Sequence, residues 1–546
     1  MKAKKILLGL LSTLCLFFTT ASLTSCQTKG LEYRLSVDKK NVVVVDYHGS
    51  STKVVIPSKY SGYSVTGIGN HAFSGCDSLT SIKIPDSVAS IGDGTFSDCS
   101  SLTNITIPNS VKSIGYDAFK GCSFLESITI PNSVASIGDG TFSDCSSLTN
   151  ITIPNSVKSI GNHAFSGCDS LTSIKIPDSV TSIGVGTFSD CSSLTNITIP
   201  NGVKSIGYDA FKGCSSLESI AIPNSVASID GAFRNCSALK NITIPNSVKS
   251  IGAAFSGCSS LESITIPNSV KSIGAGAFSD CSSLTNITIP NSVASIGDGA
   301  FKGCRSLENI TIPNRVITIG SYAFSECDSL TSMIIPDYVT RIGRSAFYGC
   351  SSLRKITIPI VALPDDFGAE RFSLIFAPHD VNNGHSSYVP SSLKEVIITN
   401  TKVIEAFSFA NCRNITNITI PDSVTSIGFG AFKGCRSLTN ITIPNSVTAI
   451  GGDAFYNCSS LTSITIPDSV TSIDSEAFSG CSSLRSIIIP NSVTQLHKDT
   501  FKGASLKTIY YTGTKEQWNK IYIRDNNTVG HDLYLPTTNI IYNYKG

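Results

Sequence analysis

The sequence has few charged residues and no block of basic ones. Only 15% of its 546 residues are charged, and 41 Lys and Arg stand against 39 Asp and Glu. An average domain has roughly 25% charged residues. Nucleic-acid binding needs clustered basic residues, so we expect no nucleic-acid partner. The hydrophobic residues make up 41% of the chain and fall at repeated positions, which argues against a disordered chain.

Sequence motifs that carry chemistry are also absent. The chain has no Gly-x-Ser-x-Gly elbow, no phosphate-binding loop and no Cys-x-x-Cys pair. The histidines are scattered, and His71 and His163 occupy the same turn position of a repeat, where we expect them in solvent. We therefore predict no catalytic residue, no cofactor and no metal, and we do not expect an enzyme.

One stretch nevertheless gathers potential metal ligands, namely Asp365, Asp366, His379, Asp380 and His385. The stretch lacks helical spacing and has no cysteine partner, so a solvated loop is the favoured interpretation. An enzyme with a site in residues 360–392 is the alternative.

Residues 1–25 have the layout of a secretory signal peptide. A short stretch with three lysines precedes an apolar run over residues 6–18, and small residues then lead to Cys26. Leu23-Thr24-Ser25-Cys26 resembles a bacterial lipobox, which implies that Cys26 is lipidated and begins the mature protein. Ordinary cleavage beside an unmodified Cys26 is the alternative. No second apolar stretch of ~20 residues follows, so we expect a protein anchored to the membrane and not spanning it.

Cysteines recur at a fixed spacing along most of the chain. Most steps are 23 residues and two are 22. A fixed period of 20–29 residues, built on spaced Leu and Ile residues, predicts a solenoid of stacked coils. The repeated positions are Cys76, Cys99, Cys122, Cys145, Cys168, Cys191, Cys214, Cys236, Cys258, Cys281, Cys304, Cys327, Cys350, Cys412, Cys435, Cys458 and Cys481.

Within one coil, the apolar positions predict which side chains point inward. Leu102, Ile105 and Ile107 alternate with polar residues near the strand end, as in a strand with one buried face. Pro108 has no N–H to donate and should end that strand. On the rest of the coil we expect further inward side chains at Val111, Ile114, Ala118, Phe119 and Cys122.

The unit Cys99-Ser-Ser-Leu102-Thr-Asn-Ile105-Thr-Ile107-Pro108 resembles the treponeme-type leucine-rich repeat of BspA-like bacterial surface proteins. The resemblance extends over roughly residues 54–511. We predict a single right-handed, β-rich leucine-rich-repeat solenoid with parallel strands and about eighteen 23-residue coils. BspA-like relatives are implicated in adhesion to host matrix proteins and in coaggregation, so the resemblance implies a binding protein.

The repeat cysteines are expected to be reduced and buried. Parallel side chains of stacked coils hold their Cβ atoms ~4.8 Å apart, which is wider than a disulfide prefers. Ala504 replaces cysteine in the last coil, as a small buried filler would. Some disulfide bonding is the alternative, and metal binding is a third.

Gly115 occupies a position at which other coils carry Asp230, Glu405, Asp474 and His497. A glycine required for positive φ would not be replaced so readily by these residues. We therefore expect glycine here to be favourable and not essential.

The breaks in the repeat divide the chain into segments. We expect Asn41–Val45 and Val54–Pro57 to be strands that start the stack. The segments are a lipoprotein signal peptide (1–25), lead and cap strands (26–65), a repeat array (66–359), an insertion (360–392), a continued array (393–511) and a C-terminal cap (512–546).

The insertion supplies the candidate binding residues, since it departs from the repeat and concentrates aromatic residues. Some of these aromatics must pack beneath the loop, and those left exposed would anchor a ligand. We expect deletion of residues 364–391 to leave the solenoid folded and to weaken binding. The candidates are Phe367, Phe372, Phe376, His379, His385 and Tyr388.

The outward strand positions form a second candidate surface. They carry short neutral polar residues such as Asn104 and Thr106, which stack for stability or bind weakly over many coils. The sequence of four coils that begins at Asn70 recurs almost unchanged from Asn162, as expected for a protein whose function depends on an extended surface.

We predict a lipid-anchored, surface-exposed binding protein of the bacterial cell envelope, an adhesin for host proteins, bacterial surface proteins or glycans. A structural envelope lipoprotein is the alternative.

Overall fold

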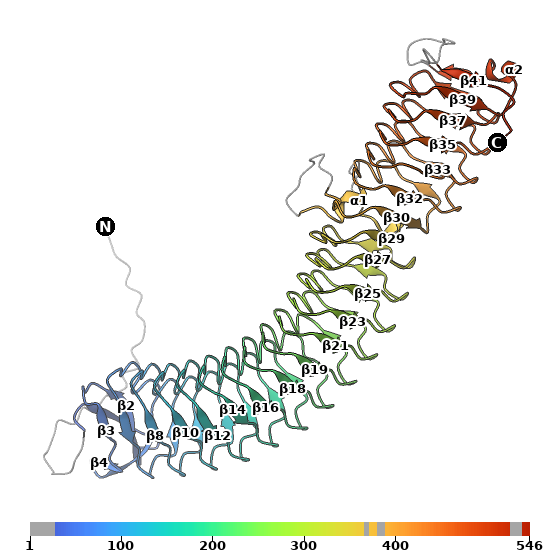
Figure 1. Ribbon diagram of the computed structural model, residues 1–546. Coiled ribbons are helices and arrows are strands. Elements are labelled where there is room, and N and C mark those ends of the chain that lie inside the picture. Colours follow the sequence, from blue (N-terminus) through green and yellow to red (C-terminus); the bar gives the residue numbers. More distant parts are fainter. Residues whose placement is uncertain (1–27, 365–370, 379–387, 525–537, 546) are drawn as a thin grey trace, which may run out of the picture. The chain divides into compact units, whose positions relative to one another are not determined.

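The computed structural model describes residues 28–364, 371–378, 388–524 and 538–545 (Figure 1). They form a parallel β-solenoid of about 20 turns of roughly 23 residues, with almost no helix. The chain divides into two compact units, residues 1–192 and 193–546. The leucine-rich-repeat solenoid expected from the 23-residue period is confirmed.

The first unit begins with strands that cover its first coil. The strand β1 (Leu31–Leu35) pairs antiparallel with β2 (Asn41–Tyr47), and β2 pairs parallel with β5 (Tyr63–Ile68). The short β4 (Lys59–Tyr60) folds back on β5, whereas β3 (Lys53–Val55) starts the main ladder by pairing with the first repeat strand. Both segments expected to start the stack are therefore strands.

Each coil of the first unit contributes two strands to two parallel ladders. The first ladder contains β6 (Ser81–Lys83), β8 (Asn104–Thr106), β10 (Ser127–Thr129), β12 (Asn150–Thr152) and β14 (Ser173–Lys175). The second ladder contains β7 (Ser90–Ile91), β9 (Ser113–Ile114), β11 (Ser136–Ile137), β13 (Ser159–Ile160) and β15 (Ser182–Ile183). The two-residue ladder was not expected from the sequence.

The second unit repeats the same two ladders. Its longer strands are β16 (Asn196–Thr198), β18 (Ser219–Ala221), β19 (Asn241–Thr243), β21 (Ser263–Thr265), β23 (Asn286–Thr288), β25 (Asn309–Thr311), β27 (Ser332–Ile334), β29 (Lys355–Pro359), β30 (Glu395–Thr399), β32 (Asn417–Thr419), β35 (Ser463–Thr465), β37 (Ser486–Ile489), β39 (Thr508–Tyr511) and β41 (Asn539–Ile541). Its second ladder holds β17 (Ser205–Ile206), β20 (Ser250–Ile251), β22 (Ser272–Ile273), β24 (Ser295–Ile296), β26 (Thr318–Ile319), β28 (Arg341–Ile342), β31 (Val403–Ile404), β33 (Ser426–Ile427), β34 (Ala449–Ile450), β36 (Ser472–Ile473), β38 (Gln495–His497) and β40 (Tyr522–Arg524).

The core of each coil is filled by the apolar positions of the repeat. In the coil that contains β8, the predicted inward side chains are all buried, including Leu102, Ile105, Phe119 and Cys122. Phenylalanines of successive coils stack face to face, with ring centroids 5.3–5.5 Å apart from Phe73 to Phe165. Because one coil buries its apolar side chains against its two neighbours, the stack and not the single coil is the stable object.

Gly115 does not have positive φ, as its replacement in other coils indicated. The left-handed positions of this coil are instead Asp117 (φ 51°) and Gly121 (φ 70°). A Cβ atom on Gly115 would lie 2.5 Å from the backbone nitrogen of Asp93 in the preceding coil. Glycine is thus favoured here by the close approach of two coils.

The insertion leaves the strand ladder in register. The strand β29 pairs directly with β30 from Lys355↔Glu395 to Pro359↔Thr399, so the repeat resumes where the sequence indicated. Between them lie the 3₁₀ turn η1 (Ile360–Ala362) and the short helix α1 (Arg371–Leu374). The insertion therefore belongs to one enlarged coil.

The chain beyond residue 511 extends both ladders. The strand β40 pairs with β38 and β41 pairs with β39, while the helix α2 (Lys515–Trp518) begins at Thr514 with a capping box. The ring of Trp518 packs edge-on against Tyr511 at 5.1 Å. Among the described residues, no helix has the length and apolar character needed to cross a bilayer.

Candidate binding surface

The outward face of the longer ladder carries short polar side chains in most coils, interrupted by charged or apolar ones such as Lys83, Lys175 and Ile334. Ser127 pairs with Asn150 and Thr129 with Thr152, and all four side chains are exposed. The residues between them, such as Ile128, point into the core. The face therefore offers repeated hydroxyl and amide groups at the spacing of the strands, and it presents little charge.

Three of the six candidate residues of the insertion lie within the described part of the chain. Phe372 and Phe376 are fully or almost fully buried, and Tyr388 is half-buried. Phe367, His379 and His385 lie outside the described residues. The two buried phenylalanines are the aromatics that the sequence required beneath the loop, and they cannot anchor a ligand.

Phe372 and Phe376 complete the phenylalanine stack across the insertion. The ring of Phe376 lies 6.1 Å from Phe347, that of Phe372 lies 5.0 Å from Phe409, and the two insertion rings are 5.4 Å apart. The backbone is also joined to both neighbours, since the amide of Phe347 donates to the Ile375 carbonyl oxygen at 2.8 Å. A deletion of residues 364–391 would remove both buried rings, so the structure favours destabilisation of the solenoid over the intact folding expected from the sequence.

The repeat cysteines are free thiols that pack in the core of the stack. All 17 are free, and all but the half-buried Cys76 are buried. The thiol of Cys281 donates to the Phe255 carbonyl oxygen at 3.1 Å, and the same bond recurs in most coils. Burial raises the pKa of the Cys122 thiol to about 12, so it remains protonated at neutral pH. The predicted packing role agrees with this environment.

A shallow polar hollow lies on the turn side of the first unit. It is lined by Tyr116, Asp117, Lys120 and His163, among others. His163 is exposed, as its turn position predicted. Asp139 at the hollow's rim is engaged between coils, because its Oδ1 accepts from the Asn162 backbone N–H at 2.7 Å.

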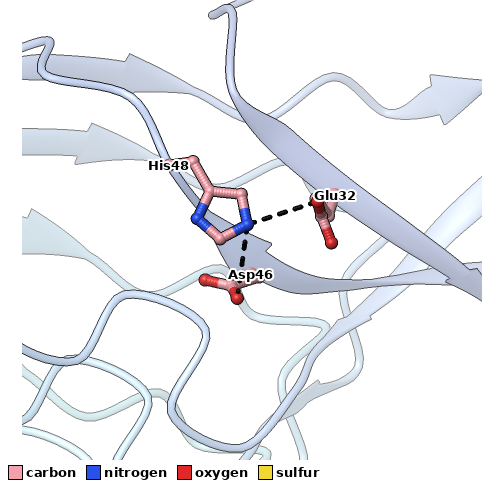
Figure 2. A group of neighbouring side chains, drawn as sticks. All are labelled: Glu32, Asp46 and His48. Atoms are coloured by element: carbon pink, nitrogen blue, oxygen red, sulfur yellow. Dashed lines mark ion pairs between the residues drawn. The ribbon is translucent and has the colours of Figure 1, made fainter. Parts of the chain in front are cut away.

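The structure brings together one cluster that the sequence did not indicate (Figure 2). Nε2 of His48 lies 3.2 Å from Oε1 of Glu32 and 3.6 Å from Oδ2 of Asp46. Glu32 and Asp46 are cross-strand partners, and a β-bulge beside Glu32 turns Asp46 and His48 to the solvent face. These three residues could have been grouped from the sequence only if the pairing of β1 with β2 had been predicted.

Chemically, this cluster serves as a surface ion-pair group. The side chain of His48 is 62% exposed and its two carboxylate partners are 43% and 50% exposed, so solvent weakens their mutual attraction. The three ligand atoms lie within 4.8 Å of one another, and a protonated His48 pairs with both carboxylates. No other grouping of three potential metal ligands occurs among the described residues.

Comparison with known proteins identifies the family to which the repeat belongs. The sequence model of the family "BspA type Leucine rich repeat region" matches residues 66–191, 158–282, 253–363 and 402–528. A search of the curated proteins finds no match.

Solved structures of bacterial repeat proteins are similar to this chain. A leucine-rich repeat protein from Bacteroides ovatus is 28% identical, with 88% of this chain and 98% of that chain covered and a TM-score of 0.38. The leucine-rich repeat protein of T. pallidum is 35% identical over 35% of this chain and 90% of that chain, with a TM-score of 0.34. The pneumococcal vaccine antigen PcpA is 23% identical over 76% of this chain and 97% of that chain, with a TM-score of 0.40.

Proposed function

Because the chain belongs to the BspA-type leucine-rich repeat proteins, we propose that it is a lipid-anchored adhesin of the bacterial cell surface. Leucine-rich repeats are generally protein-interaction modules, and families of such solenoids are typically non-enzymatic. The ligands proposed are host proteins, surface proteins of other bacteria, or their glycans.

The observation that carries this proposal is the repetition of one exposed face. Most longer strands present short polar side chains outward, and these stack in register from coil to coil within each unit. A single such contact is weak, because the residue types that dominate binding energies are rare in the row. Many weak contacts made by the repeated face of each unit add to a useful avidity.

Binding is tested by presenting the purified chain to an array of matrix proteins, bacterial surface proteins and glycans. The matched variant lacks residues 70–161, a block of four coils that returns almost unchanged from Asn162. We expect binding to at least one surface, and about tenfold or greater weakening in the shortened chain, since avidity depends on the number of contacts. If neither chain binds any surface, the adhesin proposal fails and a structural envelope role takes its place.

The anchor is tested separately through Cys26. We expect the chain to incorporate labelled fatty acid and to sediment with membranes, whereas the Cys26→Ser variant should appear in the soluble fraction. The lipobox motif Leu23-Thr24-Ser25-Cys26 supports this expectation. Membrane association of the Cys26→Ser variant, together with no fatty-acid labelling of the unaltered chain, would refute the anchor.

A further inference from the structure

One serine of the repeat forms a row of hydrogen bonds between coils of the second unit. It is the second residue after the proline that follows the longer strand, and we call this position the serine row. The hydroxyl of Ser292 donates to the Val270 carbonyl oxygen at 2.6 Å, and that of Ser492 donates to the Val470 carbonyl oxygen at 2.8 Å. The same bond is made by Ser225, Ser269, Ser446 and Ser469.

Gly202 and Thr401 also replace the serine and Ser247 makes no hydrogen bond, but large side chains take its place only in the three consecutive coils immediately before the insertion. Arg315, Tyr338 and Val361 replace the serine there. Among the described residues, neither Arg315 nor Tyr338 makes a side-chain hydrogen bond, so these coils give up a stabilising contact. A near-copied repeat that breaks its own rule at neighbouring positions points to a function at those positions.

The replacing side chains are large and face solvent. Tyr338 is 69% exposed and Val361 is 50% exposed. Ile317, which stands where other coils carry Lys, Ala or Thr, is 50% exposed. Exposed Tyr, Arg and aliphatic groups gathered in one place are typical of binding sites and not of a soluble polar ladder.

Strand pairing and backbone contacts bring these residues onto adjoining coils. The strand β26 pairs with β28 through Thr318↔Arg341, and the amide of Thr340 donates to the Ile317 carbonyl oxygen at 2.9 Å. The 3₁₀ turn η1, which carries Val361, contacts β28. In Figure 1 these coils carry β25, β27 and β29, and α1 follows β29. We call the set Arg315, Ile317, Tyr338, Arg341 and Val361 the row patch.

The charge of the row patch indicates the chemistry of its partner. Arg315 and Arg341 are exposed, and neither forms an ion pair within the part of the chain that the structure describes. The one acid directly beside a residue of the patch in the sequence is Asp337, so the two arginines outnumber it. Two free guanidinium groups beside apolar side chains complement carboxylates beside apolar side chains.

We propose that the row patch docks an acidic segment of a partner protein that also carries aromatic or aliphatic residues. The inference rests on the proposed binding function and gives it a specific contact, which the largely polar outward face of the longer ladder lacks in most coils. Three coils at ~4.8 Å span about 14 Å, so an extended peptide of about six residues is long enough to cover the patch.

The test uses the purified full chain and fluorescent peptides of about six residues. One peptide alternates Asp with Phe, a second alternates Asp with Ser, and a third alternates Lys with Phe. We expect fluorescence anisotropy to show that the Asp/Phe peptide binds at least ~10-fold more tightly than the other two. Binding should weaken as NaCl rises from about 0.05 to 0.5 M. Equal binding of the three peptides overturns the inference.

The decisive variant restores the residue of the repeat. In Arg315→Ser/Tyr338→Ser, each new hydroxyl can donate to the preceding coil as Ser292 does, so the variant should fold at least as well. We expect at least ~10-fold weaker binding of the Asp/Phe peptide. The control is Phe124→Ser, which removes a side chain that is 60% exposed and also restores a serine of the repeat, and it should bind unchanged.

Two further outcomes separate the possibilities. Equal peptide binding by the restored variant overturns the inference, while the adhesin proposal still stands if both chains bind surface proteins on the array. Sedimentation could also show that the unaltered chain is a dimer and that the restored variant is a monomer. In that case a second copy of the chain occupies the row patch, and the proposal of an acidic partner is overturned.

Discussion

At the scale of the residue, the 17 repeat cysteines, which we call the cysteine row, show how one side chain is used in many coils. Burial raises the pKa of the Cys281 thiol well above its ordinary value, and the thiol donates to the Phe255 carbonyl oxygen. Cys76, at the start of the row, is half-buried, and a hydrogen bond from Cys99 lowers the pKa of its thiol. The same residue type is thus inert within the stack and more reactive at its edge.

We expect Cys76 to be alkylated first. In the native chain at about pH 8, iodoacetamide should modify Cys76 at least ~10-fold faster than Cys281, because only the thiolate reacts and only Cys76 is accessible. Peptide mass spectrometry gives both rates, and the difference should vanish in guanidinium chloride. Equal native rates, or linked neighbouring cysteines, would contradict the assignment.

The cysteines should also make the solenoid sensitive to alkali. The pKa of Cys122 rises from 9.0 to about 12 on folding, so stability is intact below pH 9 and falls as the pH rises from 9 to 12. The loss is about 1.4 kcal/mol per pH unit for each such thiol, because the unfolded chain ionises and the folded one does not. The melting temperature measured from about pH 8 to 10.5 should fall steeply.

A variant in which alanine replaces three neighbouring cysteines, Cys258, Cys281 and Cys304, serves as the control. Alanine already occupies this position at Ala504. Between about pH 8 and 10.5, the melting temperature of this variant should fall by fewer degrees than that of the unaltered chain. Identical losses would show that other groups cause the alkaline effect.

At the scale of the element, the insertion shows how a solenoid tolerates a break. The strand β29 pairs with β30 as if no residues lay between them, while α1 and the residues after it fill the core of the enlarged coil with Phe372 and Phe376. The amide of Phe372 donates to the Ser408 carbonyl oxygen at 3.0 Å, which joins α1 to the following coil. The insertion is therefore tied to the core on both sides.

We expect Phe372→Ala to weaken this junction by about 3–5 kcal/mol, as for other buried aromatic residues. Hydrogen-exchange mass spectrometry should show faster exchange in the coils around Phe347 and Phe409, since solenoids open locally. Phe429→Ala, which removes a ring that is 48% exposed, should cost less than about 1 kcal/mol. Unchanged exchange in Phe372→Ala would show that α1 is not part of the core.

At the scale of the whole molecule, stability comes from repeated contacts between neighbouring coils. Most strands of the longer ladder pair with the strand of the next coil, as Ser263 does with Asn286 and Asn286 does with Asn309. Such a molecule has no unique centre on which every coil depends. Its length can change by whole coils, which agrees with the copied block of four coils.

Removal of residues 70–161 should therefore give a folded chain. The deletion joins Gly69 to Asn162 and keeps the register, since the residues after Asn162 repeat those after Asn70. Circular dichroism per residue and the melting temperature should stay close to those of the full chain. A deletion of about half a coil should instead misfold, because it turns the inward side chains to the surface. Equal stability of both deletions would contradict the stacking account.

The sequence by itself determined the repeated part of the protein. The strand that Pro108 ends, the inward position of Phe119 and the buried thiol of Cys122 all follow from one coil, because a coil contacts only near copies of itself. The sequence also excluded positive φ at Gly115, since other coils replace it.

Only the tertiary structure decided what the breaks in the repeat do. It placed Phe372 and Phe376 in the phenylalanine stack, gathered Glu32, Asp46 and His48 at one strand pair, and set the turn η1 against β28. These residues have no copies along the chain from which their neighbours could be inferred. Their positions depend on how unlike segments close against each other, and that is fixed by packing and strand register and not by a local pattern.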